Sequence, residues 1–120
     1  MTKYVYRKSD ATVKHKPGMD ITVYGSLGEL SPDVVYEDVE KGHSSEWYSD
    51  TATQTWYIIE GRGTFVLDGE RFDVNAGDLV SVPPKVKKYY LGKMKMVLIT
   101  SPTFNPDDEH QVRLIDEEEV

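Results

Sequence analysis

The sequence predicts an all-β protein folded as an antiparallel jelly-roll barrel, and three observations support this prediction. Apolar and polar residues alternate in short runs such as Asp20–Tyr24 and Asp33–Val39, and the side chains of a strand point alternately to its two faces. Turn signals such as Asp68-Gly69 and Ala76-Gly77-Asp78 separate the runs at short intervals. No helical periodicity precedes Asn105. Many short strands joined by regular turns are typical of a sandwich or a small barrel.

The elements can be followed along the chain as one domain in three parts. Residues 1–32 hold N-terminal strands and linker, residues 33–102 hold the barrel, and residues 103–120 form an acidic C-terminal tail. Asn105 at an N-cap and Pro106 at the first helical position predict a short C-terminal helix or turn. The expected strands are Tyr4–Tyr6, Asp20–Tyr24, Asp33–Val39, Thr55–Glu60, Thr64–Leu67, Leu79–Val82, Tyr89–Leu91 and Met94–Thr100.

Composition limits the partners that this chain can have. A chain of 120 residues is expected to form one domain. Its net charge of -7, from 14 basic and 21 acidic residues, argues against a nucleic-acid partner, because such proteins need a basic face. The sequence has no cysteine, which excludes a disulfide framework and cysteine-ligated zinc. No apolar run is long enough to span a membrane and the first residues do not read as a secretory signal, so a cytoplasmic location is expected.

Glycines and prolines between Gly42 and Gly92 have the spacing of a known protein family. Gly42 and Gly61 enclose the first segment, while Gly77, Pro83 and Gly92 mark the second. In these segments the chain resembles the cupin superfamily, whose first motif is G-x5-H-x-H-x3-4-E-x6-G and whose second is G-x5-P-x-G-x2-H-x3-N. The resemblance implies a cupin barrel with its ligand positions pointing inward. It also implies a homodimer formed by exchange of N-terminal strands, for which Tyr4–Tyr6 is the candidate.

The four positions that bind a metal in the family hold other residues here. On the motif spacing they are Tyr48, Asp50, Gln54 and Lys88. Among these side chains only the Asp50 carboxylate is a common ligand for zinc, iron or manganese, and a lysine repels a cation. We therefore expect no metal and no cofactor. A metal site would require His43 and Glu46 to turn inward, whereas His43 is expected in a solvated loop.

The same positions predict a ligand pocket inside the barrel. If alternation continues unbroken from Asp50 to Gln54, then the interior face is shared by Tyr48, Asp50, Gln54, Trp56 and Ile58. Residues of the opposite parity, namely Trp47, Tyr57 and Tyr89, would then cover the outer face. Lys88 and Tyr90 would face the first group from the second-motif strand, and Tyr36 is a further ligand-binding candidate.

Lys88 is the principal candidate for chemistry. A buried lysine is costly unless it is paired, and Asp50 is the expected counter-charge. Lys88, Tyr48 and Asp50 are the candidate catalytic residues, while Gln54, Trp56, Tyr90 and Tyr36 are candidate ligand-binding residues. Alternatively, Lys88 extends to water at the mouth of the barrel and has no function.

Three functions are compatible with this pattern. The first is a small-molecule-binding protein that holds a carbohydrate or another polar metabolite inside the barrel. The second is a metal-independent sugar isomerase, epimerase or cyclase, in which Lys88 and Tyr48 act as acid and base and Asp50 tunes Lys88. The third is a non-catalytic structural or interaction module whose barrel is filled by its own side chains.

Overall fold

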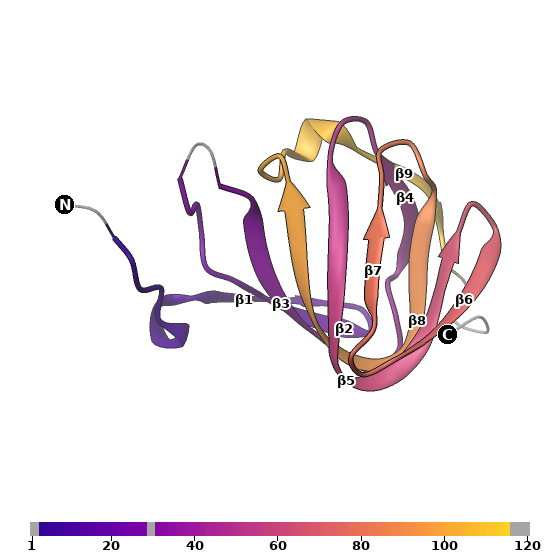
Figure 1. The fold of residues 1–120 in the computed structure, drawn as a ribbon, viewed down its shortest axis with the longest axis horizontal. Helices are drawn as coiled ribbons and strands as arrows, with labels where there is room; N and C mark the ends of the chain where they lie inside the picture. Colours follow the sequence, from indigo (N-terminus) through magenta and orange to yellow (C-terminus); the bar gives the residue numbers. More distant parts are fainter. Residues whose placement is uncertain (1–2, 29–30, 116–120) are drawn as a thin grey trace.

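The computed structural model describes residues 3–28 and 31–115. Within these residues nine strands form one curled antiparallel sheet, which closes into a half-barrel (Figure 1). Helical structure in the described part is limited to two single turns, η1 (Lys8–Asp10) and η2 (Pro106–Asp108). The prediction of an all-β antiparallel jelly-roll is confirmed.

Two strands, β5 and β8, connect the two halves of the barrel. They pair along their whole length, from Thr53 opposite Ser101 to Leu67 opposite Lys88. One path of neighbouring strands runs through β1 (Thr12–Lys16), β2 (Met19–Val23), β3 (Asp33–Val39), β8 (Lys88–Ser101), β4 (Ser45–Ser49) and β9 (Glu109–Leu114). The other strands, β6 (Glu70–Asn75) and β7 (Leu79–Val82), pair with β5 (Thr53–Leu67).

Glycine allows β5 to continue where the sequence predicts two strands and a turn. The pairing of β5 with β8 shifts register between Ile58 and Glu60, which is the mark of a bulge. Just beyond it, Gly61 has φ +88°, and a Cβ there would lie 2.2 Å from the backbone oxygen of Lys93. Only glycine tolerates both the positive φ and this contact. The bent strand therefore passes from one half of the barrel to the other without ending.

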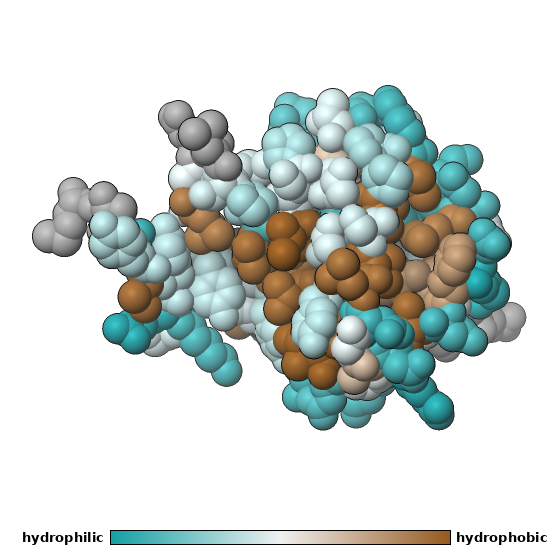
Figure 2. Space-filling view, in the orientation of Figure 1, coloured by the Kyte–Doolittle hydropathy of each residue, from teal (hydrophilic) through white to brown (hydrophobic). Residues whose placement is uncertain are grey.

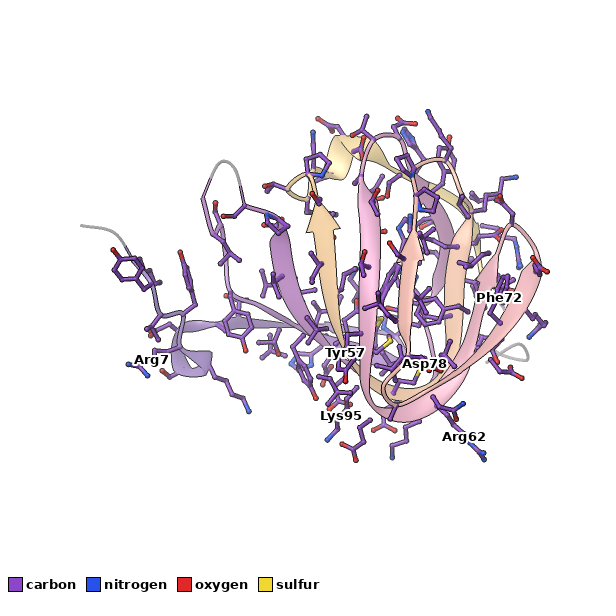
Figure 3. The ribbon with its side chains drawn as sticks, viewed as in Figure 1. Arg7, Tyr57, Arg62, Phe72, Asp78 and Lys95 are labelled. Carbon is purple, nitrogen blue, oxygen red and sulfur yellow. The ribbon has the colours of Figure 1, made fainter. Side chains whose placement is uncertain are left out.

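The core is a cluster of aromatic rings enclosed by the curled sheet. Trp56, Phe65 and Tyr90 are completely buried. Their ring centroids lie 5.1 to 5.8 Å apart, a separation at which tilted aromatic pairs attract one another. Burial of one such side chain stabilises the fold by about 1.5–3 kcal/mol. Figure 3 shows side chains from the surrounding strands filling this interior, while Arg7 lies on the N-terminal segment well away from it.

Both ends of the chain differ from expectation. Tyr4–Tyr6 is not a strand, and the first strand is β1, which extends away from the barrel together with the N-terminal segment (Figure 1). Asn105 caps η2 as predicted, by accepting a hydrogen bond from the backbone N–H of Asp107 at 3.0 Å. The prediction of an acidic tail from residue 103 misses β9, which pairs with β4; residues 116–120 lie outside the described residues. No helix in the described residues is long and apolar enough to cross a membrane.

Candidate functional site

A cavity of about 640 Å³ opens on the inner side of the half-barrel. Strands β1, β2, β3, β4, β8 and β9 contribute to its wall, together with Gln54 at the start of β5. The wall is largely apolar, and Glu37, His43, Gln54 and Glu109 are among its polar side chains. An apolar cavity with a few converging polar groups is the usual form of a small-molecule site.

Strand β4 presents the opposite face to the interior from the one that the sequence predicts. Trp47 points inward, where its Nε1 donates to Oε1 of Gln54 at 3.1 Å. Tyr48 points outward and stacks on His110 with ring centroids 5.0 Å apart. The reason is that β4 ends at Ser49 and β5 begins at Thr53, so the turn between them breaks the alternation. Tyr48 therefore does not face the cavity.

Asp50 lies on the surface and is not the counter-charge of Lys88. Its carboxylate accepts a hydrogen bond from Nζ of Lys85 at 2.7 Å and also pairs with His110. The hydrogen bond from Lys85, followed by the one from His110, lowers the pKa of Asp50. The predicted Asp50–Lys88 pair is wrong, because the turn after Ser49 carries Asp50 out of the barrel.

Lys88 is completely buried inside the barrel, as expected. The turn before it keeps the geometry of the motif, because Lys85 takes the left-handed backbone conformation, φ +73°, that glycine normally supplies. Nζ of Lys88 donates to Oγ of Ser49 at 3.2 Å and lies 5.0 Å from the centre of the Trp47 ring. Burial lowers the pKa of Lys88 to about 8. A fraction of this lysine is thus neutral near neutral pH.

The carboxylate that neighbours Lys88 is Glu109, the first residue of β9. Ser49 receives a hydrogen bond from Lys88 and donates its own to Oε2 of Glu109 at 2.6 Å. Burial raises the pKa of Glu109, while the hydrogen bond from Ser49 and the charge of Lys88 oppose this rise. Since Glu109 lines the cavity, two hydrogen bonds through Ser49 connect Lys88 with the cavity wall.

Glu37 is a second cavity carboxyl group, and sequence reasoning missed it. Its Oε1 accepts hydrogen bonds from Nε1 of Trp56 at 2.9 Å and from the hydroxyl of Tyr90 at 3.0 Å. Burial raises the pKa of Glu37 to about 7, although both hydrogen bonds favour the charged form. Its signal in the sequence was an acidic residue on the same face of β3 as the apolar residues Val35 and Val39.

His43 also faces the cavity, in contrast to the solvated loop that was expected. Its ring stacks on Trp47 at 4.1 Å and meets the edge of Tyr90 at 5.6 Å. Nδ1 lies 2.8 Å from the carbonyl oxygen of Ser45. The backbone N–H of Ser45 also approaches Nδ1, at 3.2 Å, but the carbonyl oxygen is closer and can only accept, so we assign the proton to Nδ1, which leaves the lone pair on Nε2. Burial lowers the pKa of His43 to about 4, so the ring is neutral at neutral pH.

The predicted ligand-binding residues have different positions in this site. Gln54 lines the cavity, and its Nε2 donates to Oγ1 of Thr100 at 3.3 Å. Trp56 and Tyr90 are completely buried and contact residues that line the cavity. Trp56 donates a hydrogen bond to Glu37, and the ring of Tyr90 contacts His43. Tyr36 is half-buried on the opposite face of β3 from Glu37 and does not line the cavity.

A second cavity, of about 670 Å³, lies near the other end of the barrel. Glycine backbone and charged side chains such as Asp38, Glu40 and Lys41 line much of it, and His43 borders it as well. The buried polar groups Glu37 and Glu109 face only the first cavity. Chemistry is therefore better supported in the first cavity than in the slightly larger second one.

The residues present do not fit the transition metal that cupin motifs imply. Two of the four motif positions, Tyr48 and Asp50, lie outside the cavity, and the other two hold the amide of Gln54 and the cation Lys88. In residues 3–28 and 31–115 no three His, Cys, Asp or Glu side chains are grouped so that they could hold a metal ion. His43 faces the cavity, but Glu46 pairs with Nε of Arg113 at 3.2 Å.

Comparison with known proteins gives both a family and close relatives. The family model described as Cupin domain matches residues 35–100. A curated relative, acireductone dioxygenase from Bacillus pumilus, is 31% identical over 91 residues, which is 72% of this chain and 50% of that protein. An uncharacterised protein of Methanocaldococcus jannaschii is 36% identical over 62 residues, 48% of this chain and 50% of that protein. The chain thus spans about half the length of the curated relatives it matches.

Solved structures include one relative of nearly the same length. Streptomyces Pac13, solved with uridine as a variant with a tyrosine replaced by phenylalanine, is 40% identical with a TM-score of 0.94, and the match covers 99% of this chain and 98% of that one. Another Pac13 structure, 41% identical over 98% of both chains with a TM-score of 0.94, is described as a unique nucleoside dehydratase. KdgF from Halomonas sp. is 15% identical over 88% of this chain and 98% of its own, with a TM-score of 0.71, and shows the fold alone.

Proposed function

Because this chain belongs to the cupin family, we propose that it is a metal-independent cupin that binds a nucleoside in its barrel and eliminates water from it. The observation that carries the proposal is the pairing of a neutral histidine with a protonatable carboxyl group around Tyr90. His43 contacts the ring of Tyr90, and Glu37 accepts the hydrogen bond of its hydroxyl. Elimination of water needs a base and an acid; at neutral pH His43 is unprotonated, and Glu37, with a pKa of about 7, is protonated in part.

The class of nucleoside follows from the strength of the base. An imidazole removes a proton from carbon only where a neighbouring carbonyl group stabilises the negative charge that results. An unmodified ribose has no such carbonyl. The substrate is therefore expected to be an oxidised nucleoside with a carbonyl next to the sugar carbon that loses its proton, while uridine itself serves as a probe of binding.

The reaction then divides between two side chains of the cavity. Nε2 of His43 takes the proton, and the electron pair of the broken C–H bond moves into an enolate. The enolate re-forms the carbonyl as a carbon–carbon double bond appears and the C–O bond to the β-hydroxyl breaks. Glu37 gives its proton to that hydroxyl, which leaves as water. His43 ends protonated and Glu37 ionised, and return of the proton through solvent restores both without any oxidant or reductant.

The relatives support this choice of ligand class. Pac13 has been solved with uridine, and variants of it carry phenylalanine in place of tyrosine or glutamine in place of histidine. The cavity described above also contains a histidine and rests on a tyrosine, His43 and Tyr90. An identity of 41% over nearly the whole chain supports a common ligand class more strongly than the fold alone does.

A His43→Gln variant tests the proposal. We expect the purified wild-type protein to bind uridine and to release water from an oxidised uridine, detected by mass spectrometry of the product. His43→Gln should lose at least about a hundredfold in turnover, the usual contribution of a general base. His15→Gln is the matched control, because that ring is exposed on β1 and pairs with Asp20. Equal turnover by wild type and His43→Gln would remove His43 as the base.

The pH dependence gives an independent check of the same assignment. His43 must be neutral, which holds above its pKa of about 4, and Glu37 must be protonated, which holds below its pKa of about 7. We expect turnover to be highest between these values and to fall on both sides. Binding of uridine without any turnover of oxidised nucleosides would favour a binding protein instead, the coarser function that the cavity supports.

A further inference from the structure

A chain of three polar side chains connects the buried interior with the cavity wall. Nζ of Lys88 donates to Oγ of Ser49 at 3.2 Å, and this hydroxyl donates to Oε2 of Glu109 at 2.6 Å. Each residue comes from a different strand, β8, β4 and β9. The order of donors is fixed, because an ammonium group only donates and a serine hydroxyl has a single proton. The Ser49 proton is therefore directed at Glu109.

Lys88 has no structural need for a charge at this place. It is completely buried, and its Nζ lies 5.0 Å from the centre of the Trp47 ring. Replacement of buried charges by apolar residues of similar volume is often neutral or stabilising. A charge retained at such a cost points to a function at the other end of the chain of hydrogen bonds.

Glu109 has one oxygen free for a ligand. Ser49 occupies Oε2, and in the described residues no group is hydrogen-bonded to Oε1. Glu109 lines the same cavity as Gln111, Glu37 and Trp47. An ionised carboxylate only accepts hydrogen bonds, so its natural partner is a hydroxyl or N–H donor of the bound molecule.

We propose that Lys88, acting through Ser49, holds Glu109 as an ionised acceptor for a sugar hydroxyl of the bound molecule. Lys88 is then a positioning residue, and Glu109 is a residue that selects ligands with a hydroxylated sugar. The hydroxyl part of this inference rests on the proposed nucleoside function. The coupling of Lys88 to Glu109 does not, because it concerns the ligand-free protein.

Other charged groups near Glu109 must be separated from the effect of Lys88. Asp108 and His110 are its neighbours on the chain and act on it in opposite directions, Asp108 raising and His110 lowering its pKa. The remaining charged or titratable side chains of the same cavity are Lys14 and Lys16 on β1, Asp33 and Glu37 on β3, and His43. Variants of Lys88 and Ser49 leave all of these in place.

The first experiment is an NMR titration of the Glu109 side-chain carboxyl carbon in ligand-free protein. Lys88→Met and Ser49→Ala each remove an interaction that lowers the pKa of Glu109, so both variants should shift its midpoint to higher pH than in wild type. Lys87→Met is the matched control, since Lys87 precedes Lys88 but is exposed. If Lys88→Met does not fold, Ser49→Ala still tests the coupling. A Glu109 midpoint equal in wild type and the folded variants would overturn the proposal.

The second experiment compares uridine with 2′,3′-dideoxyuridine in binding to wild type and to Glu109→Gln. A hydrogen bond to a charged acceptor corresponds to about tenfold or more in affinity. Glu109→Gln should therefore lower the affinity for uridine by about this factor and leave the affinity for dideoxyuridine nearly unchanged. Equal losses for both ligands would contradict the hydroxyl assignment. Absence of uridine binding to wild type would overturn the proposed function and the hydroxyl assignment with it, while the titration would still decide the role of Lys88.

Discussion

At the scale of single residues, the interior of this barrel shifts acids and bases toward their neutral forms. Burial raises the pKa of Glu37 to about 7 and lowers the pKa of His43 to about 4 and that of Lys88 to about 8. Transfer of a charge out of water causes all three shifts, because it disfavours the charged form of either sign. Such shifts link the stability of the fold to pH. Perturbed pKa values of this kind are also common among groups that transfer protons.

The contribution of Glu37 to the free energy of unfolding should therefore decrease as pH rises through its titration. Its folded-state pKa is raised from 4.5 to about 7, so its contribution is complete below pH 4.5 and is lost as pH rises through 7. The shift corresponds to about 3 kcal/mol. Glu37→Gln cannot ionise, yet its amide oxygen can still accept from Trp56 and Tyr90.

Urea denaturation at pH 5 and pH 8 measures this effect. His43, with its lowered pKa, adds stability over the same range in both proteins, so we expect the change from pH 5 to pH 8 to be less favourable in wild type than in Glu37→Gln. Glu70→Gln, an exposed residue of β6, should behave as wild type. The same change in wild type and Glu37→Gln would mean that Glu37 does not contribute to the pH dependence.

At the scale of strands, sequence reasoning succeeded where local signals decide the structure. The motif glycines, the Asp68-Gly69 hairpin and the interior placement of Lys88 were all predicted from spacing and alternation, and the structure has them. The orientation of β4 was not predictable in this way, because a turn at residues 50–52 shifts the parity between Ser49 and Gln54.

Three polar groups of the site occupy positions that the motifs do not define. Glu37 lies on β3 before the first motif, Glu109 lies on β9 after the second, and His43 lies inside the first motif at a position that the motif leaves open. Only the pairing of β3 with β8 and of β9 with β4 brings them to one cavity. Such long-range pairing leaves little trace in the local pattern of a strand, which explains why these residues were missed.

The motif glycines should differ in the cost of replacement by alanine, although they share a positive φ. Gly61 has φ +88° and would place a Cβ 2.2 Å from the backbone oxygen of Lys93, whereas Gly77 has φ +95° and open space around it. A positive φ costs an alanine about 1–2 kcal/mol. Gly77→Ala should lose about this amount, and Gly61→Ala about 2 kcal/mol more, because the β5–β8 pair must move apart.

Chemical denaturation of the two glycine variants compares these losses directly. The midpoint of Gly61→Ala should fall well below that of Gly77→Ala, with the same slope if both remain two-state. Similar midpoints would mean that the backbone at Gly61 adapts and that close approach does not hold the bulge in place.

At the scale of the whole molecule, the outer face of the sheet is more apolar than a monomer needs. Figure 2 shows apolar residues gathered over the strands that face the viewer. Tyr57 and Leu79 are paired across β5 and β7, and Ile99 lies on neighbouring β8; their exposed fractions are 46%, 65% and 37%. Contiguous apolar patches of this kind often mark interaction surfaces. We propose that the expected homodimer uses this face; within one chain Tyr4–Tyr6 is not part of a strand.

A charged residue at the centre of this face should separate the two copies. We expect light scattering to give twice the mass of one chain for wild type, and the mass of one chain for Leu79→Lys, because an unpaired charge would be buried in the contact. Phe72→Lys is the control: Phe72 is 43% exposed but lies on β6, away from Tyr57 (Figure 3). It should leave the dimer intact. A wild-type protein that is monomeric at high concentration would contradict the expected dimer, and a dimeric Leu79→Lys would place the contact elsewhere.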